Sequence, residues 1–442
     1  MVEEQKMGRA IRSLETIRNS KKYLASFYSR GDRSQKAGLP LAWTNGGLPQ
    51  EVLIALELPT EWVMNFAAIA ASRFASAKFC EAAEADGYSN DLCGYVRTIL
   101  GYCQRRVELG TVPPESPLKD GLGEPTMLLS ASFGCAPRFK WFQAIASHYL
   151  PVPLYVCDTM SPPYGVDMED ERVKEHYLEL IREDLKAQIA FVEEHTGKKL
   201  DIAKLREVVE NSQKAAKLWY DTLELRKAVP CPMNTPDYFS GMIPQMWMPG
   251  SEEGVKFYQD LYNEVKQRVD NKVGVIPEEK CRLIWYGIPP WFNLGLFNYF
   301  ESLGAVFVSE IIYYVGPPVD IDLSDPLEAL IQRVWLKALW LHKQGLNFFP
   351  DNVAHLCIAM PMNTNFVRQQ VKDFKIDGAV MHRTRSCRAA SWGETFIKND
   401  LAKDGTPSLI FESDIADPRA WSDAQFKTQV DAFMEILTAK KK

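Results

Sequence analysis

The 442-residue sequence lacks the short motifs that identify the commonest cofactor sites. It has no GxxxxGK(S/T) loop to hold the phosphates of ATP, and His195-Thr196-Gly197-Lys198 is a poor substitute. It has no GxGxxG fingerprint for a nicotinamide or flavin dinucleotide. No two cysteines are spaced CxxC, so a compact zinc or ferredoxin motif is excluded.

Long apolar runs and an excess of positive charge are also missing. No apolar run reaches the roughly 18 residues that cross a bilayer. The formal net charge of -6 offers no strongly basic face for nucleic acid. The first 30 residues lack the apolar centre of a signal peptide. We therefore expect a cytoplasmic protein that binds neither membrane nor nucleic acid.

The residues that are present fit a large soluble protein. The hydrophobic fraction is 46% and the charged fraction 24%, as in globular domains. A chain of 442 residues is too long for one ordinary core, so two or three domains are expected. Its 11 Trp, 17 Tyr and 22 Phe suit large cores, subunit contacts or an apolar ligand pocket, and do not choose among them.

Alternating strand and helix patterns predict an α/β fold. A charged helical segment covers residues 1–36, and a first α/β domain covers 37–165. Its expected strands are 39–43, 127–132 and 153–157. Its expected helices are 50–56 and 138–148. The first strand stops at Asn45-Gly46-Gly47, and Pro49 suits the first turn of the following helix.

The rest of the chain predicts a helical hairpin and a second α/β domain. Apolar residues recur at helical spacing through 166–229, with a break near Gly197. The second domain is expected over 230–442. Its expected strands are 282–287, 305–308, 377–382 and 408–412. We therefore expect two Rossmann- or flavodoxin-like parallel-sheet domains joined by a helical segment.

Two of the nine cysteines stand at strand ends, where α/β proteins bind ligands, and a third lies at a helix start. Cys135 follows the strand 127–132 and opens a helix, and Cys387 follows 377–382 and is expected to open another. Cys93 lies on or just before a helix, where the N-terminus favours a thiolate by about 0.3–1 kcal/mol. Thiols converging from two domains would form a metal site at the interdomain cleft. The spacing alone equally allows three unrelated core cysteines.

Other candidate residues lie near the end of the expected strand 377–382 or, in the case of the aromatic ones, near the end of the expected strand 282–287. His382 is the best-placed acid, although a structurally satisfied histidine is the commoner case. Arg383 and Arg388 are candidates for contacting phosphate groups, although solvated arginines are the default. Trp285, Trp291 and Phe292 are candidates for walling an apolar pocket, and core packing is at least as common.

The order of elements and several motifs resemble the 2-hydroxyacyl-CoA dehydratase and benzoyl-CoA reductase family. The resemblance covers the chain from residue 37 onward, and each motif is weak alone. The matching stretches are Asn90-Asp91-Leu92-Cys93-Gly94-Tyr95-Val96, Met127 to Phe142, Asp377-Gly378-Ala379, Ser386-Cys387, Pro407 to Phe411, Glu412-Ser413-Asp414, Asp417-Pro418-Arg419 and the closing helix from Gln425 to Phe433.

The resemblance implies a 4Fe–4S cluster held by Cys93, Cys135 and Cys387 at the interdomain cleft. Three thiolates leave one iron open to another ligand or to substrate. It also implies a smaller homologous cluster-bearing subunit and two ATPase subunits that carry their own cluster. A ferredoxin would supply the electrons, and the substrate would be an aromatic CoA thioester.

The function expected from this resemblance is that of the larger non-ATPase subunit of a benzoyl-CoA reductase. Such an enzyme reduces benzoyl-CoA, or a substituted analogue, to a cyclic dienoyl-CoA by a two-electron, ATP-dependent step. One alternative is a subunit of a 2-hydroxyacyl-CoA dehydratase, in which the electron is only a recycled trigger. Another is a non-catalytic electron-relay subunit.

Overall fold

Two separate four-stranded sheets organise the protein. The computed structural model describes residues 8–45, 49–132, 135, 137–157, 165–347, 360–361, 364–387, 390–391 and 393–440. The strands of the two sheets are β1 (Ala42–Thr44), β2 (Thr60–Trp62), β3 (Met127–Ala131), β4 (Leu154–Cys157), β5 (Cys281–Tyr286), β6 (Ala305–Glu310), β9 (Gly378–Thr384) and β10 (Ser408–Ser413). A short antiparallel pair is formed by β7 (Leu346–Asn347) and β8 (Met360–Pro361).

The first sheet has the order β2-β1-β3-β4, and the second has the order β10-β9-β5-β6. All pairs within both sheets are parallel, with Ala42 opposite Met127 in the first and Leu283 opposite Gly378 in the second. Every residue of β1, β3, β5 and β6 is buried, as expected for parallel strands covered on both faces. The expectation of two parallel α/β units is confirmed.

The helices of the first half precede two long helices. They are α1 (Glu15–Arg18), α2 (Lys21–Lys36), α3 (Gln50–Ala55), α4 (Val63–Ser72), α5 (Ser76–Ala85), α6 (Gly94–Leu109), α7 (Pro137–Ala144) and the π-helix Ile145–Tyr149. The long helices α8 (Glu171–Thr196) and α9 (Ile202–Glu224) follow. Asp170 and Asp201 begin them as N-caps, and Gly197, in the left-handed region, ends α8.

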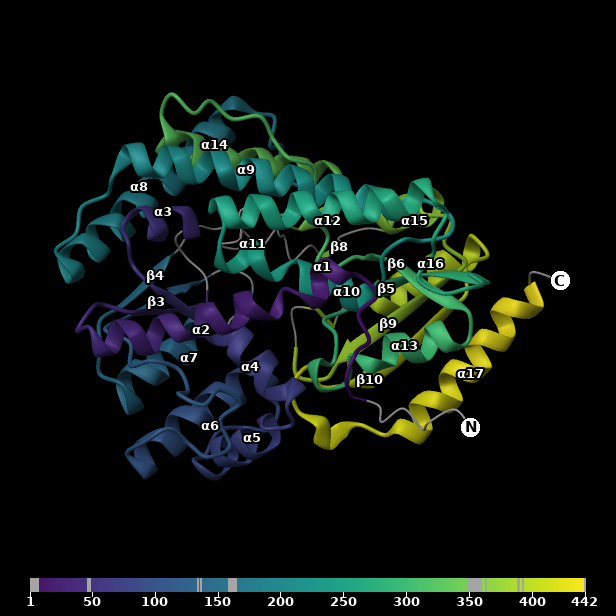
Figure 1. The fold of residues 1–442 in the computed structure, drawn as a ribbon, viewed down its shortest axis with the longest axis horizontal. Helices are drawn as coiled ribbons and strands as arrows, with labels where there is room; N and C mark the ends of the chain where they lie inside the picture. Colours follow the sequence, from purple (N-terminus) through teal and green to yellow (C-terminus); the bar gives the residue numbers. More distant parts are fainter. Residues whose placement is uncertain are drawn as a thin grey trace.

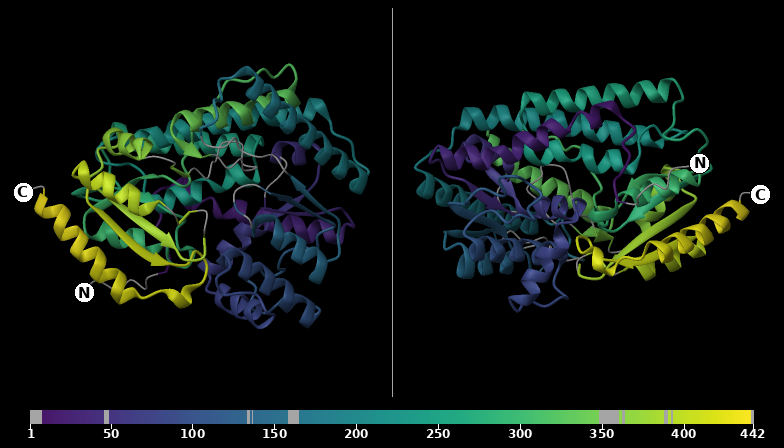
Figure 2. Two further views of the ribbon diagram at one scale, coloured as in Figure 1. Left: turned by 180° about the vertical axis from the view of Figure 1, so that it is seen from behind. Right: turned by 60° about the horizontal axis from the view of Figure 1, so that its bottom comes forward.

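The helices of the second half are α10 (Thr235–Gly241), α11 (Ile243–Trp247), α12 (Glu252–Asp270), α13 (Gly295–Ser302), α14 (Pro326–Lys343), α15 (Asn365–Asp373), α16 (Glu394–Lys403) and α17 (Asp423–Lys440), with 3-10 turns at 225–227, 291–293 and 418–420. In Figure 1, α8, α9, α12 and α14 form a helical layer above both sheets, while α5 and α6 lie below the first. The further views in Figure 2 show the same layer, with α17 along the outer side of the second sheet.

A buried ion pair fastens this helical layer to the first α/β unit. Glu51 of α3 is fully buried and accepts from the Arg333 guanidinium of α14 at 2.9 Å. The same carboxylate accepts from the Ser212 hydroxyl of α9 at 2.7 Å. Breaking one partner of such a pair leaves an uncompensated buried charge, so these contacts hold α3, α9 and α14 in one arrangement.

Some expected elements shifted or were missed. β1 begins at Ala42, three residues later than expected, and the brief strand β2, whose central residue is Glu61, gave too little pattern to recognise. Glu61 is fully buried and accepts from the Gly123 amide at 2.9 Å. Cys387 was expected to open a helix, but in the described part of the chain the helix that follows it, α16, begins only at Glu394. Among the described residues, no helix is long and apolar enough to cross a membrane.

Helices α5 and α6 approach each other closely at Gly101. A Cβ at this position would lie 1.8 Å from the carbonyl oxygen of Phe79, a backbone atom that cannot move aside. We expect Gly101→Ala to lower the free energy of unfolding by about 3 kcal/mol or more. Urea unfolding followed by circular dichroism checks this. Val107→Ala, on an exposed part of the same helix, is the control and should change it by less than about 0.5 kcal/mol.

Candidate functional site

Cys93 occupies the N-cap of α6, the helix that begins at Gly94. The backbone N–H of Val96 lowers the pKa of the Cys93 thiol, as expected at a helix N-terminus, although burial raises this pKa more. The Gly94 N–H donates across the molecule to the Ser386 hydroxyl at 3.2 Å. Ser386 is the neighbour of Cys387, so this bond brings segments of Cys93 and Cys387 side by side.

Cys135 lies beyond the end of β3, just before α7. Burial raises the pKa of the Cys135 thiol, and the Arg138 guanidinium and the Arg138 N–H both oppose this change. Arg138 is itself fixed, because its Nε donates to the Asn45 carbonyl at 2.7 Å. The Asn45 side chain donates back to the Arg138 carbonyl at 2.7 Å, so the start of α7 is tied to the end of β1.

Cys387 follows β9, and its N–H donates to the Thr384 carbonyl at 3.1 Å in a tight turn. Burial raises the pKa of the Cys93 thiol, and the charged forms of Cys387 and Cys135 raise it further. Cys387 and Cys135 therefore each lie within electrostatic reach of Cys93. That one cluster joins all three thiols stays a prediction.

Their exposure sets these three cysteines apart. Of the eight described cysteines, only Cys93, Cys135 and Cys387 are partly exposed. The fully buried ones, which fit the core interpretation, are Cys80, Cys103, Cys157, Cys231 and Cys281. Cys357 lies outside the described residues.

The donor set suits an iron–sulfur cluster better than a single metal ion. No group of three or more His, Cys, Asp or Glu side chains in the described ranges is placed to hold one metal ion. A cluster binds each thiolate through a different iron, so its ligands stand farther apart. Thiol ligands, partial burial and N–H groups facing the sulfur atoms are the features that such clusters use. Cys93, Cys135 and Cys387 thus fit a cluster with one iron left without a thiolate.

His382, predicted as a catalytic acid, is fully buried with both ring nitrogens engaged. Nδ1 lies 2.5 Å from the Ile288 carbonyl and therefore carries the proton. Nε2 lies 2.7 Å from the Ser413 hydroxyl, which donates to it. Burial lowers the pKa of His382 to about 4, so the ring is neutral near pH 7. These contacts favour a structural role in joining β5, β9 and β10.

The three aromatic candidates occupy different environments. Trp285 is fully buried, and its indole N–H donates to the Gly287 carbonyl at 2.7 Å. Phe292 is buried against Trp421, with ring centroids 5.8 Å apart. Only Trp291 reaches the cysteine region, because its indole N–H donates to the hydroxyl of Tyr95, two residues after Cys93. Trp291 therefore remains a candidate wall, whereas the other two positions favour core packing.

Charged residues near Cys387 include one that sequence reasoning missed. Arg383 is partly buried and contacts Thr395, and Arg388 lies outside the described residues. Glu394, at the start of α16, is 2% exposed, and no hydrogen-bond partner is described for its Oε1. Burial raises the pKa of this carboxyl, although Arg383 opposes the change. Burial raises the pKa of the Tyr286 hydroxyl at the end of β5, and the charges of Glu394 and Cys387 raise it further.

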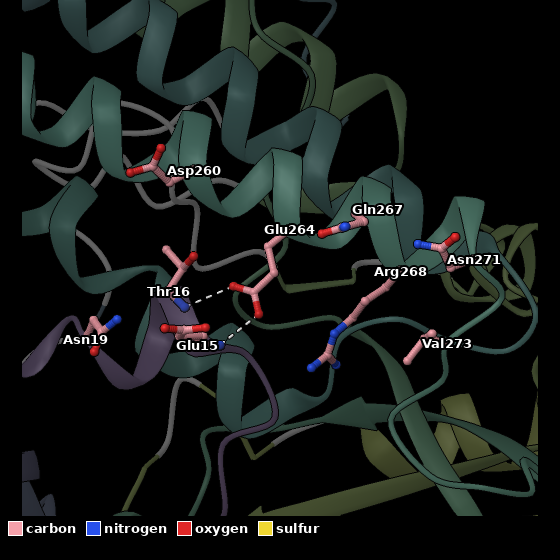
Figure 3. Close-up of a pocket in the computed structure, with 9 residues that line it drawn as sticks. All are labelled: Glu15, Thr16, Asn19, Asp260, Glu264, Gln267, Arg268, Asn271 and Val273. Atoms are coloured by element: carbon pink, nitrogen blue, oxygen red, sulfur yellow. Dashed lines mark hydrogen bonds between the residues drawn. The ribbon is translucent and has the colours of Figure 1, made fainter.

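A pocket of about 530 Å³ lies elsewhere, between α1 and α12. Figure 3 shows the Glu264 carboxylate turned toward the backbone N–H groups of Glu15 and Thr16, which donate to it at 2.7 and 2.9 Å. Arg268 donates to the Ser13 carbonyl at 2.7 Å. These polar groups fasten the N-terminal segment to α12, so the pocket is an open groove beside a structural contact.

Fold and site together describe two parallel α/β units and, among the described cysteines, three that are partly exposed. The model of the family described as 2-hydroxyglutaryl-CoA dehydratase, D-component, matches residues 46–437. The chain belongs to this family, as the resemblance predicted.

Curated relatives include enzymes of two kinds. The (R)-2-hydroxyisocaproyl-CoA dehydratase alpha subunit of Clostridioides difficile is 28% identical over 95% of this chain and 95% of its own length. The (R)-phenyllactyl-CoA dehydratase alpha subunit of Clostridium sporogenes is 28% identical over 93% and 91%. A benzoyl-CoA reductase subunit of Thauera aromatica is 28% identical over 81% and 79%. All three are named as subunits of larger enzymes.

The buried neutral state of His382 predicts a pH dependence of stability. Its pKa is about 4 in the folded chain and near 6.5 in the unfolded chain, so the unfolded chain binds the extra proton between these values. The contribution is complete above pH 6.5, is lost as pH falls through 4, and amounts to about 3 kcal/mol at most.

Urea unfolding at several pH values, with wild type and His382→Gln compared, measures this contribution. The difference between the two proteins should shrink as pH falls, because only the wild type loses stability by protonating this ring. His148→Gln, at an exposed histidine, is the control and should follow the wild type. An unchanged difference across the window would contradict the buried neutral ring.

Proposed function

We propose that this chain is the iron–sulfur subunit of an enzyme that transforms a CoA thioester after receiving a low-potential electron. The proposal is supported by three partly exposed thiols among the described cysteines, two of which, Cys135 and Cys387, lie within electrostatic reach of Cys93. When bound, a 4Fe–4S cluster with one iron free of thiolate would supply electron transfer and a site for a substrate oxygen.

The chain's own residues would exclude water, carry a proton and bind the phosphate groups of the substrate. Tyr95 and Trp291 form a wall beside Cys93 that excludes water from one side of the site. Glu394 holds a buried carboxyl near Cys387 whose Oε1 can carry a proton, a role that the bonded ring of His382 suits less well. Arg383 is a candidate for the phosphate groups of CoA, and the same role for Arg388 remains a prediction.

Of the two reactions in the family, dehydration of a 2-hydroxyacyl-CoA is the one we propose first. The support is the extent of the similarity, since both dehydratase alpha subunits align over more than nine-tenths of each chain. The reductase subunit aligns over 81% of this chain and 79% of its own length at the same identity.

Reduction of benzoyl-CoA, expected from the sequence, is the second candidate. The aromatic groups next to Cys93 favour it, because they suit a planar ring. Trp291 stands edge-to-face with Phe239, with centroids 5.4 Å apart, and Phe239 meets Tyr313 at 5.6 Å. A phenyl-bearing hydroxyacyl chain would use the same wall, so the reaction itself must be tested.

The partners proposed for either reaction are the same. A smaller cluster-bearing subunit would complete the enzyme, and two ATPase subunits with their own cluster would deliver electrons taken from a ferredoxin. The naming of the relatives as subunits supports an enzyme built from several different chains.

The assignment of the three ligands predicts the iron content of cysteine variants. Cys93→Ala, Cys135→Ala and Cys387→Ala should each lower iron and sulfide per chain by about tenfold when the protein is isolated without oxygen. Cys103→Ala and Cys281→Ala, at buried thiols, are matched controls and should retain both. Normal iron in all three variants, or its loss in a control, would overturn the assignment.

The reaction is decided by turnover with defined substrates. We expect the complete enzyme, supplied with ATP and a strong reductant, to convert 2-hydroxyacyl-CoA thioesters to 2-enoyl-CoA without net consumption of electrons. Mass spectrometry of the products, together with the reductant consumed, checks this. Conversion of benzoyl-CoA to a dienoyl-CoA, with two electrons consumed per product, would assign the second candidate instead.

A further inference from the structure

Arg97 occupies a buried position on α6, one turn after Cys93, and is only 3% exposed. Its Nε donates to the Leu92 carbonyl at 2.9 Å, just before Cys93. Its Nη2 donates to Asp414 at 3.2 Å and its Nη1 to Asp417 at 2.7 Å, both in the segment after β10. One guanidinium therefore spans the segment that presents Cys93 and a segment of the second α/β unit.

Asp414 extends this contact to the second cysteine segment. Its Oδ2 accepts from the Ser386 hydroxyl at 2.5 Å, and Ser386 precedes Cys387. Its Oδ1 accepts from the backbone N–H groups of Ala416 and Asp417 at 2.9 and 3.0 Å, which fixes the carboxylate. The path Cys93–Arg97–Asp414–Ser386–Cys387 thus crosses the junction of the two units through side-chain hydrogen bonds.

The backbone beside Cys93 is shaped to admit this carboxylate. A Cβ on Gly94 would lie 2.1 Å from Asp414 Oδ1, so only glycine permits the approach. The Gly94 N–H meanwhile donates to the Ser386 hydroxyl, closing a second link between the two segments. With Asp414 only 3% exposed, its pairing with the guanidinium is shielded from water and depends on good geometry.

We propose that Arg97 and Asp414 are positioning residues that hold the Cys93 and Cys387 segments at the separation a shared cluster requires. The inference rests on the proposed function, because it assumes that these thiols bind one cluster. It goes further by assigning the spacing of the ligands to a buried arginine–carboxylate pair rather than to the two sheets alone. Groups behind metal ligands commonly change affinity by about 10–100-fold when removed.

The primary test compares Arg97→Ala with Arg97→Lys in the full chain isolated without oxygen. Arg97→Ala should lower iron and sulfide per chain by about tenfold and alter the EPR spectrum of the iron that remains. Arg97→Lys keeps the charge but not the planar fork, so it should retain more iron than the alanine variant. Asp414→Asn, which preserves the shape of the carboxylate, should resemble Arg97→Lys.

Arg419→Ala is the matched control. Arg419 pairs with Asp417 and Glu84, as Arg97 does, but it is not bonded to Asp414 or to the turn before Cys93. It should therefore retain iron and an unchanged spectrum. A readout without iron is cross-linking of Cys93 to Cys387 by a short bis-maleimide in iron-free protein, quantified by peptide mass spectrometry. This reaction should be fast in wild type and in Arg419→Ala, and slower in Arg97→Ala.

The outcomes separate this inference from the proposed function. A folded Arg97→Ala chain with wild-type iron, spectrum and cross-linking would overturn the positioning role, even if the cysteine variants lose iron. Loss of iron in Arg419→Ala to the same extent as in Arg97→Ala would also overturn it, because general destabilisation would then explain both. If the three cysteine variants keep their iron, the proposed function is wrong, and the inference that rests on it is wrong as well.

Discussion

The structure depends on a buried polar contact between segments far apart in the sequence. Arg97 follows Cys93, Asp414 accepts from the residue before Cys387, and both charged groups are shielded from water. Isolated buried charges are strongly unfavourable, so each group requires the other in place. This requirement links the first α/β unit to the second through the segments that carry Cys93 and Cys387. The polar contact therefore holds these two segments, one from each unit, side by side.

Much of the fold could be predicted because its signals are local. The strands β3, β5, β6, β9 and β10 are apolar runs bounded by turn residues, and they lie close to their expected positions. The strand β2 was missed because three residues with a central glutamate carry no pattern. Glu61 accepts from the amide of Gly123 there, a contact that depends on the tertiary fold. The domain boundaries expected from the sequence remain predictions.

In the candidate site, too, only the residues with a local sequence signal could be predicted. Cys135 and Cys387 could be picked out because parallel strands place ligands beyond their carboxyl ends. Nothing local distinguishes Arg97 from an ordinary helix arginine, since the two aspartates that it joins to α6 are more than 300 positions away. Likewise, position favoured His382 as an acid, yet the burial and two hydrogen bonds that make its ring neutral are visible only in three dimensions. Residues whose role depends on distant partners are those that sequence reasoning cannot rank.

The central claim is that one cluster joins Cys93, Cys135 and Cys387 across the two α/β units. Membership of the family makes a CoA-thioester enzyme the natural setting, and the arrangement of the thiols explains how one iron would remain open to substrate. Anomalous diffraction at the iron edge, from crystals of the anaerobically isolated protein, tests the claim most directly. We predict one compact iron peak within bonding distance of all three sulfur atoms. Iron bound at other residues, or a peak that contacts the cysteines of only one unit, would contradict the claim.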